Sequence, residues 1–195
     1  MDNLKNKNSK CYKEIIKNNL VEKFKNYTEN FKTIKERVNK NIEKTISKIS
    51  DLKRNKIIIL SGYPGSGKST VTSMLKDIGY QVLSLDDNIK SYKELSEIAK
   101  DKVEKKNVEY LVLDGTFLRQ KDLNEFNWVK EKKNYDLLFI YMNISIYYAY
   151  YNNINRCLDR RSKRKLVPFK VYENMEKNKD ILLPDKGVYV INYDV

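Results

Sequence analysis

The sequence predicts an α/β fold in which a five-stranded parallel sheet lies between helices and follows an N-terminal α-helical extension. Five short apolar runs alternate with longer amphipathic stretches from residue 56 onward. A glycine-rich loop follows the first run directly, and the first 55 residues hold none of the chain's six glycines and three prolines. These observations divide the chain into a helical extension, residues 1–55, and an α/β domain, residues 56–195.

The extension is basic, with 15 lysines and arginines against 7 acidic residues. Its apolar residues recur every three or four positions, which predicts one or two long amphipathic helices. We expect this stripe to pack on the α/β domain or on a second copy of the chain, giving a homo-oligomer. The alternative is a basic arm that binds nucleic acid. The stripe consists of Ile16, Leu20, Phe24, Tyr27, Phe31, Ile34, Val38, Ile42, Ile46, Ile49 and Leu52.

The five apolar runs are apolar on both faces, as strands of a parallel sheet covered by helices should be. Alternating strands and helices of this kind build a doubly wound domain with right-handed crossovers. The predicted strands are Lys56–Ser61, Gln81–Leu85, Tyr110–Leu113, Asp136–Met142 and Val188–Asn192. The predicted helices span residues 68–78, 89–105, 120–133, 145–164 and 168–179.

Composition excludes several classes of protein. The net charge of +13 favours partners that carry phosphate. The absence of histidine excludes the common zinc sites and a histidine general base, and Cys11 and Cys157 are too few for a disulfide framework. No apolar run approaches the ~20 residues that span a bilayer, and the first ten residues lack a signal peptide's apolar segment. We therefore expect a cytoplasmic protein without membrane association.

Residues 62–70 read GYPGSGKST and match the phosphate-binding pattern G-x-x-x-x-G-K-[ST], directly between a predicted strand and a predicted helix. Glycines in such a loop let successive backbone N–H groups point at a phosphate, and the helix N-terminus adds partial positive charge. We expect Lys68 to bridge the β- and γ-phosphates of ATP and the Ser69 hydroxyl to hold Mg²⁺. The expected ATP-binding residues of this P-loop are Gly62, Gly65, Ser66, Gly67, Lys68, Ser69 and Thr70.

Carboxylates follow the second and third predicted strands. Asp86 and Asp87 stand at the end of the second, where ligands of open α/β sheets bind. Asp86 is the expected general base for an attacking hydroxyl, while Asp87 either contacts substrate or caps the helix that follows. Asp114 ends the third strand, where it would touch the acceptor or a metal-bound water, or simply form a turn.

Four of the seven arginines fall between residues 156 and 164. Arg156, Arg160 and Arg164 are four apart and share one helix face, with Arg161 beside them. Such a face would clamp phosphates from a mobile lid, and the alternative is an ordinary solvated basic face.

With these motifs, the chain resembles the 5′-hydroxyl polynucleotide kinases of the P-loop kinase superfamily over residues 57–180. The resemblance implies that Lys68 and Ser69 bind ATP and Mg²⁺ and that Asp86 activates the acceptor hydroxyl, with Asp87 and Asp114 on the substrate side. It also implies that Arg160 and Arg164 engage the ATP phosphates, so that Asp86, Lys68 and Arg164 are the catalytic residues. The matching segments are residues 62–70, Asp86-Asp87, residues 160–164, Val167-Pro168, Val171 and Met175.

The acceptor side departs from that family. An arginine usually stands three residues after the catalytic aspartate, where this chain has Ile89 with Lys90 beside it. After the third strand the family tends to D-x-N, and here Asp114-Gly115-Thr116 stands.

Three functions remain as hypotheses. The leading one is an ATP- and Mg²⁺-dependent kinase that phosphorylates the 5′-hydroxyl of RNA or DNA, with nucleic acid as its partner. The second is a small-molecule phosphotransferase, such as a nucleotide-sugar kinase resembling zeta toxins or a nucleoside kinase, and Ile89 favours it. The third is a nucleic-acid-binding or docking protein that uses the N-terminal helices, with the nucleotide as a switch.

Overall fold

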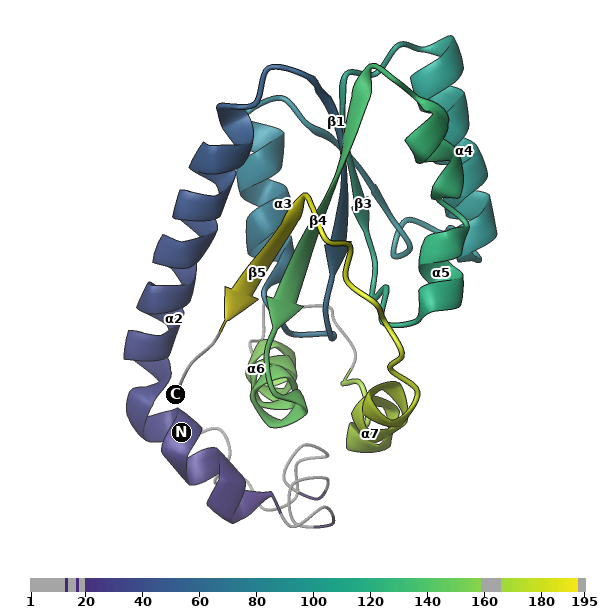
Figure 1. Ribbon diagram of the computed structural model, residues 1–195. Helices are drawn as coiled ribbons and strands as arrows, with labels where there is room; N and C mark the ends of the chain where they lie inside the picture. Colours follow the sequence, from purple (N-terminus) through teal and green to yellow (C-terminus); the bar gives the residue numbers. More distant parts are fainter. Residues whose placement is uncertain (1–12, 14–16, 18–19, 159–165, 193–195) are drawn as a thin grey trace.

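The computed structural model describes residues 13, 17, 20–158 and 166–192 (Figure 1). Strands and helices alternate along this part of the chain. They are α2 (Val21–Ser50), β1 (Asn55–Ser61), α3 (Lys68–Asp77), β2 (Gln81–Ser84), α4 (Tyr92–Lys105), β3 (Tyr110–Asp114), α5 (Gln120–Asn124), the 3₁₀ helix η2 (Asn127–Glu131), β4 (Tyr135–Asn143), α6 (Ile146–Leu158), α7 (Phe169–Lys177) and β5 (Val188–Asn192).

The strands form one parallel sheet in the order β2-β3-β1-β4-β5. Figure 1 shows α2 and α3 on one side of this sheet and α4 and α5 on the other, with α6 and α7 beyond the ends of β1 and β4. The predicted α/β fold with a five-stranded parallel sheet is confirmed, and each predicted strand agrees with the observed one to within one residue at either end.

Two predicted helices differ from the observed ones. The stretch 120–133 is not one helix but α5 followed by η2. The helix expected from residue 89 begins at Tyr92, because Ser91 caps it by accepting a hydrogen bond from the Glu94 backbone N–H at 3.1 Å. The helix expected over 145–164 is observed as α6 up to Leu158, and residues 159–165 lie outside the described part of the chain.

The apolar stripe of α2 is buried within this chain. Its helix packs against α3, α6 and β5, so it covers one side of the sheet. The Phe24 ring lies 5.4 Å from the Tyr151 ring and 6.1 Å from the Tyr150 ring, measured between centroids. Ile16, the first residue of the predicted stripe, lies outside the described residues. The buried members of the stripe are Leu20, Phe24, Ile34, Val38, Ile42, Ile46 and Ile49.

The sheet's central strands form the rest of the same core. β1 is buried from Lys56 to its end, and β3 and β4 bury their middle residues. Because every strand runs in the same direction, all of their C-terminal ends meet at one edge of the sheet. Among the described helices, none is long and apolar enough to cross a bilayer.

Candidate active site

The P-loop, residues 62–70, connects β1 to α3 through a backbone that only glycine adopts easily. Gly67 immediately precedes α3 with φ of 98°, and Gly65 has φ of 81°. Gly65 also lies so close to α6 that a Cβ atom on it would stand 2.2 Å from the Ala149 carbonyl oxygen. The loop therefore curls tightly over the end of β1, and α3 begins at Lys68 with its N-terminus directed at the loop.

Lys68 is held over this loop. Its Nζ donates hydrogen bonds to the carbonyl oxygens of Gly62 at 2.8 Å and Tyr63 at 3.0 Å. The ammonium group also lines a cavity of about 590 Å³ that opens beside the loop. A phosphate in this cavity would meet the lysine charge together with the N-terminus of α3.

Side chains of α6 and α7 fasten the loop from behind. Asn152 Nδ2 donates to the Gly65 carbonyl oxygen at 3.1 Å, and the Tyr172 hydroxyl donates to the Pro64 carbonyl oxygen at 3.0 Å. The hydroxyl of the buried Tyr63 donates a further hydrogen bond, to the Glu176 carboxylate of α7. Burial raises the pKa of Tyr172, so its hydroxyl stays protonated and remains a donor.

The sheet register brings the acidic residues to the loop. Asp114 of β3 pairs with Leu60 of β1 on one side and with Ser84 of β2 on the other. Ser84 then holds the following turn, because its Oγ accepts a hydrogen bond from the Asp86 backbone N–H at 3.2 Å. Asp86 and Asp114 consequently line the same cavity as Lys68.

This cavity gathers six of the ten predicted site residues that the structure describes, and we call it the phosphate cavity. The exposed Asp86 and Lys68 of the loop line it together. The lining residues are Pro64, Gly65, Gly67, Lys68, Ser69, Ser84, Leu85, Asp86, Asp114, Gly115, Thr116, Asn153, Arg156 and Val167.

Asp87 does not join this group. Its side chain is exposed and stands outside the lining of the phosphate cavity. The expectation that Asp87 caps the next helix is wrong, because the chain continues for several residues before α4 and Ser91 is the cap. A backbone hydrogen bond from the Asp87 N–H to the Ser84 carbonyl oxygen at 3.0 Å instead closes the turn that holds Asp86.

Arg156 is the member of the arginine cluster that the structure describes. It lies near the C-terminal end of α6 and lines the phosphate cavity. Arg160, Arg161 and Arg164 lie outside the described residues, so the proposed clamp by Arg160 and Arg164 stays a prediction.

Several residues of the site could not be recognised from local sequence. Asn152 and Asn153 on α6 reach the loop and the cavity, although nothing in their surroundings marks them. Thr116 stands where the resembled family has asparagine, and its Oγ1 lies 2.7 Å from the Tyr92 hydroxyl, which also accepts from the Phe117 N–H at 3.1 Å. The departure from D-x-N is the one signal that pointed to Thr116.

The oxygen donors of the phosphate cavity fit Mg²⁺. Mg²⁺ in nucleotide sites uses one or two protein oxygens and completes its shell with phosphates and waters. The Ser69 hydroxyl and the carboxylates of Asp86 and Asp114 all line the cavity. Within the described residues there is no cluster of three or more acidic, histidine or cysteine side chains that would bind a metal by themselves.

Comparison with known proteins identifies the family. A family model described as zeta toxin matches residues 39–139, slightly more than half of the chain. The chain belongs to the zeta toxin family. This zeta toxin family member is therefore a P-loop kinase by family, and the match favours the zeta-toxin-like alternative over a polynucleotide kinase.

A solved structure with a TM-score above 0.5 supports the fold of this family member. A gluconokinase from Sinorhizobium meliloti 1021 superposes with a TM-score of 0.51 at 13% identity, covering 71% of this chain and 83% of that chain. A deoxyadenosine kinase from M. mycoides gives a TM-score of 0.42 at 20% identity, covering 71% of this chain and 91% of that chain. A search of curated proteins finds no significant match.

Proposed function

We propose that this protein is an ATP-dependent kinase that phosphorylates a hydroxyl group of a small, anionic molecule such as a nucleotide sugar. The observation that carries the proposal is the phosphate cavity, in which Lys68 and Ser69 of the loop share one space with the Asp86 carboxylate. Its volume of about 590 Å³ falls in the range of small-molecule sites, roughly 300–1,000 Å³.

The acceptor side supports an anionic substrate. A neighbouring cavity of about 540 Å³ shares Leu85 with the phosphate cavity, so the two adjoin beyond Asp86. Four basic side chains line it against two acidic ones, and Ile89 stands among them in place of the arginine of polynucleotide kinases. The basic residues are Lys90, Lys93, Arg119 and Lys121, and the acidic ones are Asp122 and Glu125.

Arg119 is already organised in this second cavity. Its Nε and one terminal nitrogen donate to the two carboxylate oxygens of Asp122 at 2.9 and 3.0 Å. That pair raises the pKa of the guanidinium, so its charge is permanent and its plane is fixed. A phosphate or diphosphate group of the acceptor would bind beside this fixed plane, with Lys90 and Lys93 nearby.

The chemistry that follows is an in-line transfer. Asp86 accepts the proton of the acceptor hydroxyl while the hydroxyl oxygen bonds to the γ-phosphorus, and the bond from that phosphorus to the β–γ bridging oxygen breaks to release ADP. Lys68 holds the β- and γ-phosphates, and Arg156 adds positive charge from the α6 wall. Bound Mg²⁺ would neutralise phosphate charge, with Ser69 as its ligand.

The test is transfer of label from γ-labelled ATP to nucleotide sugars, nucleosides, gluconate and 5′-hydroxyl oligonucleotides. We expect label on a nucleotide sugar. Asp86→Asn should lower the rate about 10²–10⁴-fold, because the proton acceptor is removed, while ATP affinity stays the same. Asp77→Asn, an exposed carboxylate on the surface of α3, is the matched control and should keep full activity. If only the oligonucleotides become labelled, the proposal of a small-molecule acceptor is wrong and the result supports the polynucleotide kinase hypothesis.

A further inference from the structure

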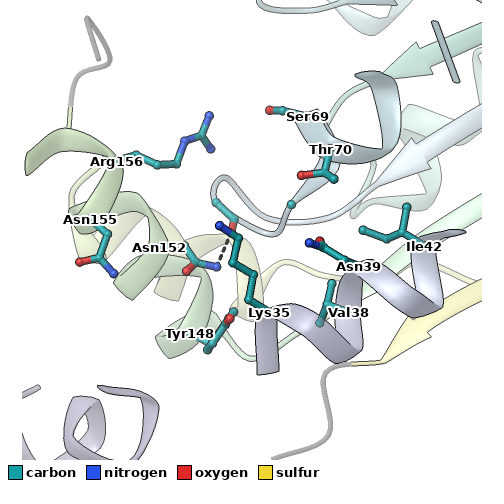
Figure 2. Close-up of a pocket in the computed structure, with 12 residues that line it drawn as sticks. Lys35, Val38, Asn39, Ile42, Ser69, Thr70, Tyr148, Asn152, Asn155 and Arg156 are labelled. Atoms are coloured by element: carbon teal, nitrogen blue, oxygen red, sulfur yellow. Dashed lines mark hydrogen bonds between the residues drawn. The ribbon is translucent and has the colours of Figure 1, made fainter. Parts of the chain in front are cut away.

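A second cavity, of about 410 Å³, lies beside the P-loop and is built by three elements that are far apart in the sequence. Figure 2 shows side chains of α2, the loop and α6 converging on it. We call it the side cavity. Its lining residues are Lys35, Val38, Asn39 and Ile42 from α2, Gly65, Gly67, Ser69 and Thr70 from the loop and the start of α3, and Tyr148, Asn152, Asn155 and Arg156 from α6.

The side cavity and the phosphate cavity meet along the loop. Gly65, Gly67, Ser69 and Arg156 line both of them. The two differ in their acidic groups, because Asp86 and Asp114 line the phosphate cavity and none of the described residues that line the side cavity is acidic. A molecule that places phosphates in the loop can therefore extend into the side cavity without approaching a carboxylate of these residues.

The acceptor fixes which way the donor nucleotide extends. Under the proposed function, the attacking hydroxyl has to lie between Asp86 and the γ-phosphorus, which places that phosphorus in the phosphate cavity that Asp86 lines. The nucleoside half of ATP then needs a different space that is continuous with the loop. The side cavity is such a space, and its volume lies within the range of small-molecule sites.

The lining of the side cavity suits a nucleoside. Val38 and Ile42 of α2 are 4% and 1% exposed, so this apolar wall is fixed in the core. The amides of Asn39, Asn152 and Asn155 surround it with groups that both donate and accept hydrogen bonds. An apolar wall with a few convergent polar groups is the usual composition of a small-molecule site, and a nucleoside is a ligand of that kind.

Asn152 and Tyr148 in this lining already have hydrogen-bond partners within the protein. Asn152 donates to the loop at Gly65, and its side chain also bonds the Tyr148 hydroxyl. Burial raises the pKa of Tyr148 to about 12, which keeps that hydroxyl protonated at neutral pH. Asn39 approaches from the opposite wall, and Figure 2 shows its amide directed from α2 into the cavity.

We propose that the side cavity binds the base and ribose of the phosphoryl donor, with α2 as one wall and Asn39 as the residue that contacts the base. The inference rests on the proposed kinase function and adds a role for the N-terminal extension, whose α2 helix becomes part of the donor site. An amide can present a donor and an acceptor to the edge of an adenine ring at the same time. Lys35, on the turn of α2 that precedes Asn39, supplies a positive charge toward the ribose and α-phosphate side.

The test compares two ligands that share a phosphate chain. Inorganic tripolyphosphate has the chain alone, and ATP has the chain and the nucleoside. Asn39→Trp fills the side cavity, so it should weaken ATP binding about tenfold or more while leaving tripolyphosphate binding unchanged in calorimetric titrations. Asn39→Ala removes the amide without adding bulk and should weaken ATP by a smaller factor, again without affecting tripolyphosphate.

Lys40→Trp is the matched control, because it adds the same side chain to an exposed position of α2 outside the cavity lining. It should leave both affinities unchanged. Lys68→Ala should weaken both ligands, since both place phosphates in the loop. If both Asn39 variants leave ATP affinity at the wild-type value, or weaken ATP and tripolyphosphate equally, the assignment of the side cavity is overturned and the kinase proposal stands. If wild-type protein binds neither ligand, the kinase proposal itself fails.

Discussion

Gly65 joins the phosphate loop to α6 at a distance that leaves no room for a side chain. Its φ is +81°, and a Cβ atom there would stand 2.2 Å from the Ala149 carbonyl oxygen. The left-handed backbone alone costs an alanine roughly 1–2 kcal/mol. Because the clash adds to this backbone cost, Gly65→Ala should lower the free energy of unfolding by more than about 2 kcal/mol. The same substitution should weaken ATP binding. Urea denaturation and nucleotide titration measure the two effects.

Gly79 provides the control for that substitution. It also has a positive φ, +96°, but nothing lies within 4 Å of a Cβ atom built on it. Gly79→Ala should therefore show the backbone cost alone, about 1–2 kcal/mol, with ATP affinity unchanged. Equal losses of stability in the two variants would mean that α6 shifts away from the added Cβ atom without lowering the free energy of unfolding further.

Lys56 is a buried charge, with its side chain 2% exposed and its Nζ 4.9 Å from the centre of the Tyr110 ring. Burial lowers the pKa of this lysine from 10.5, and the charge of Asp136 partly opposes the shift. The unfolded chain therefore holds the lysine proton more tightly than the folded chain does. The free-energy cost of burying the charged lysine is fully present below its folded pKa, and this cost disappears as the pH rises to 10.5. Consequently, the stability of wild type relative to Lys56→Met should rise with pH across that window, as measured by denaturation at several pH values. A difference that does not change with pH would contradict this.

At the scale of residues, the sequence predicts the loop side of the site better than its walls. Lys68 and Asp86 stand in short motifs whose spacing already specifies a strand end and a helix start. Asn39 and Asn152 carry no such signal, because each joins the site only after α2 and α6 have packed against each other. Both are asparagines in a chain where that residue is common, so composition could not single them out.

At the scale of elements, the start of α4 separates two interpretations of the residues after β2. Ser91 accepts a hydrogen bond from the Glu94 N–H at 3.1 Å, and Glu94 accepts one from the Lys90 N–H at 2.7 Å. Ser91→Ala should destabilise the protein by about 1 kcal/mol, the usual value of a lost cap. Asp87→Ala is the comparison, and thermal denaturation should show no loss of cap stability. A larger loss at Asp87 would restore that residue as the cap.

The stretch from α5 to η2 shows why the sequence predicts one helix where the structure has two short ones. Leu123, Phe126 and Val129 are three residues apart, a spacing that fits an α-helix over two turns and a 3₁₀ helix over any length. In the structure the Phe126 N–H bonds the Leu123 carbonyl and the Val129 N–H bonds the Phe126 carbonyl, both with the three-residue step. This arrangement keeps Phe126 and Val129 at 1% exposure each, as an α-helix with the same spacing could also do. Periodicity in so short a segment cannot distinguish the two.

At the scale of the whole molecule, α2 is inseparable from the sheet. Seven of its apolar side chains, including the cap residue Leu20, belong to the same buried cluster as the strands. Burying each contributes about 1.5–3 kcal/mol, and whole domains are stable by only about 5–15 kcal/mol. Deleting residues 1–50 should therefore abolish cooperative unfolding in calorimetry. A truncated chain that unfolds cooperatively near the wild-type temperature would show that α2 is an accessory.

The net charge of the chain and the location of its basic residues in the fold favour different partners. A net charge of +13 suggested a polynucleotide partner. In the structure, basic residues such as Lys90, Lys93 and Arg119 line a cavity beside Asp86, where they serve a compact anion equally well. Total charge cannot separate these uses, because the location of each lysine depends on the packing of elements distant in sequence.

The contact of α2 with β5 joins a helix formed early in the chain to a strand formed some 140 residues later, the first and last long elements of the described residues. A ribosome releases the chain N-terminus first at about 5–20 residues per second, so α2 emerges on the order of ten seconds before β5. Until β5 emerges, the apolar stripe of α2 can pack against α3 and α6 but lacks the strand that completes its contact surface. This contact can form only after β5 has left the exit tunnel, and a prematurely stopped message that lacks β5 would yield a chain in which part of the stripe stays uncovered.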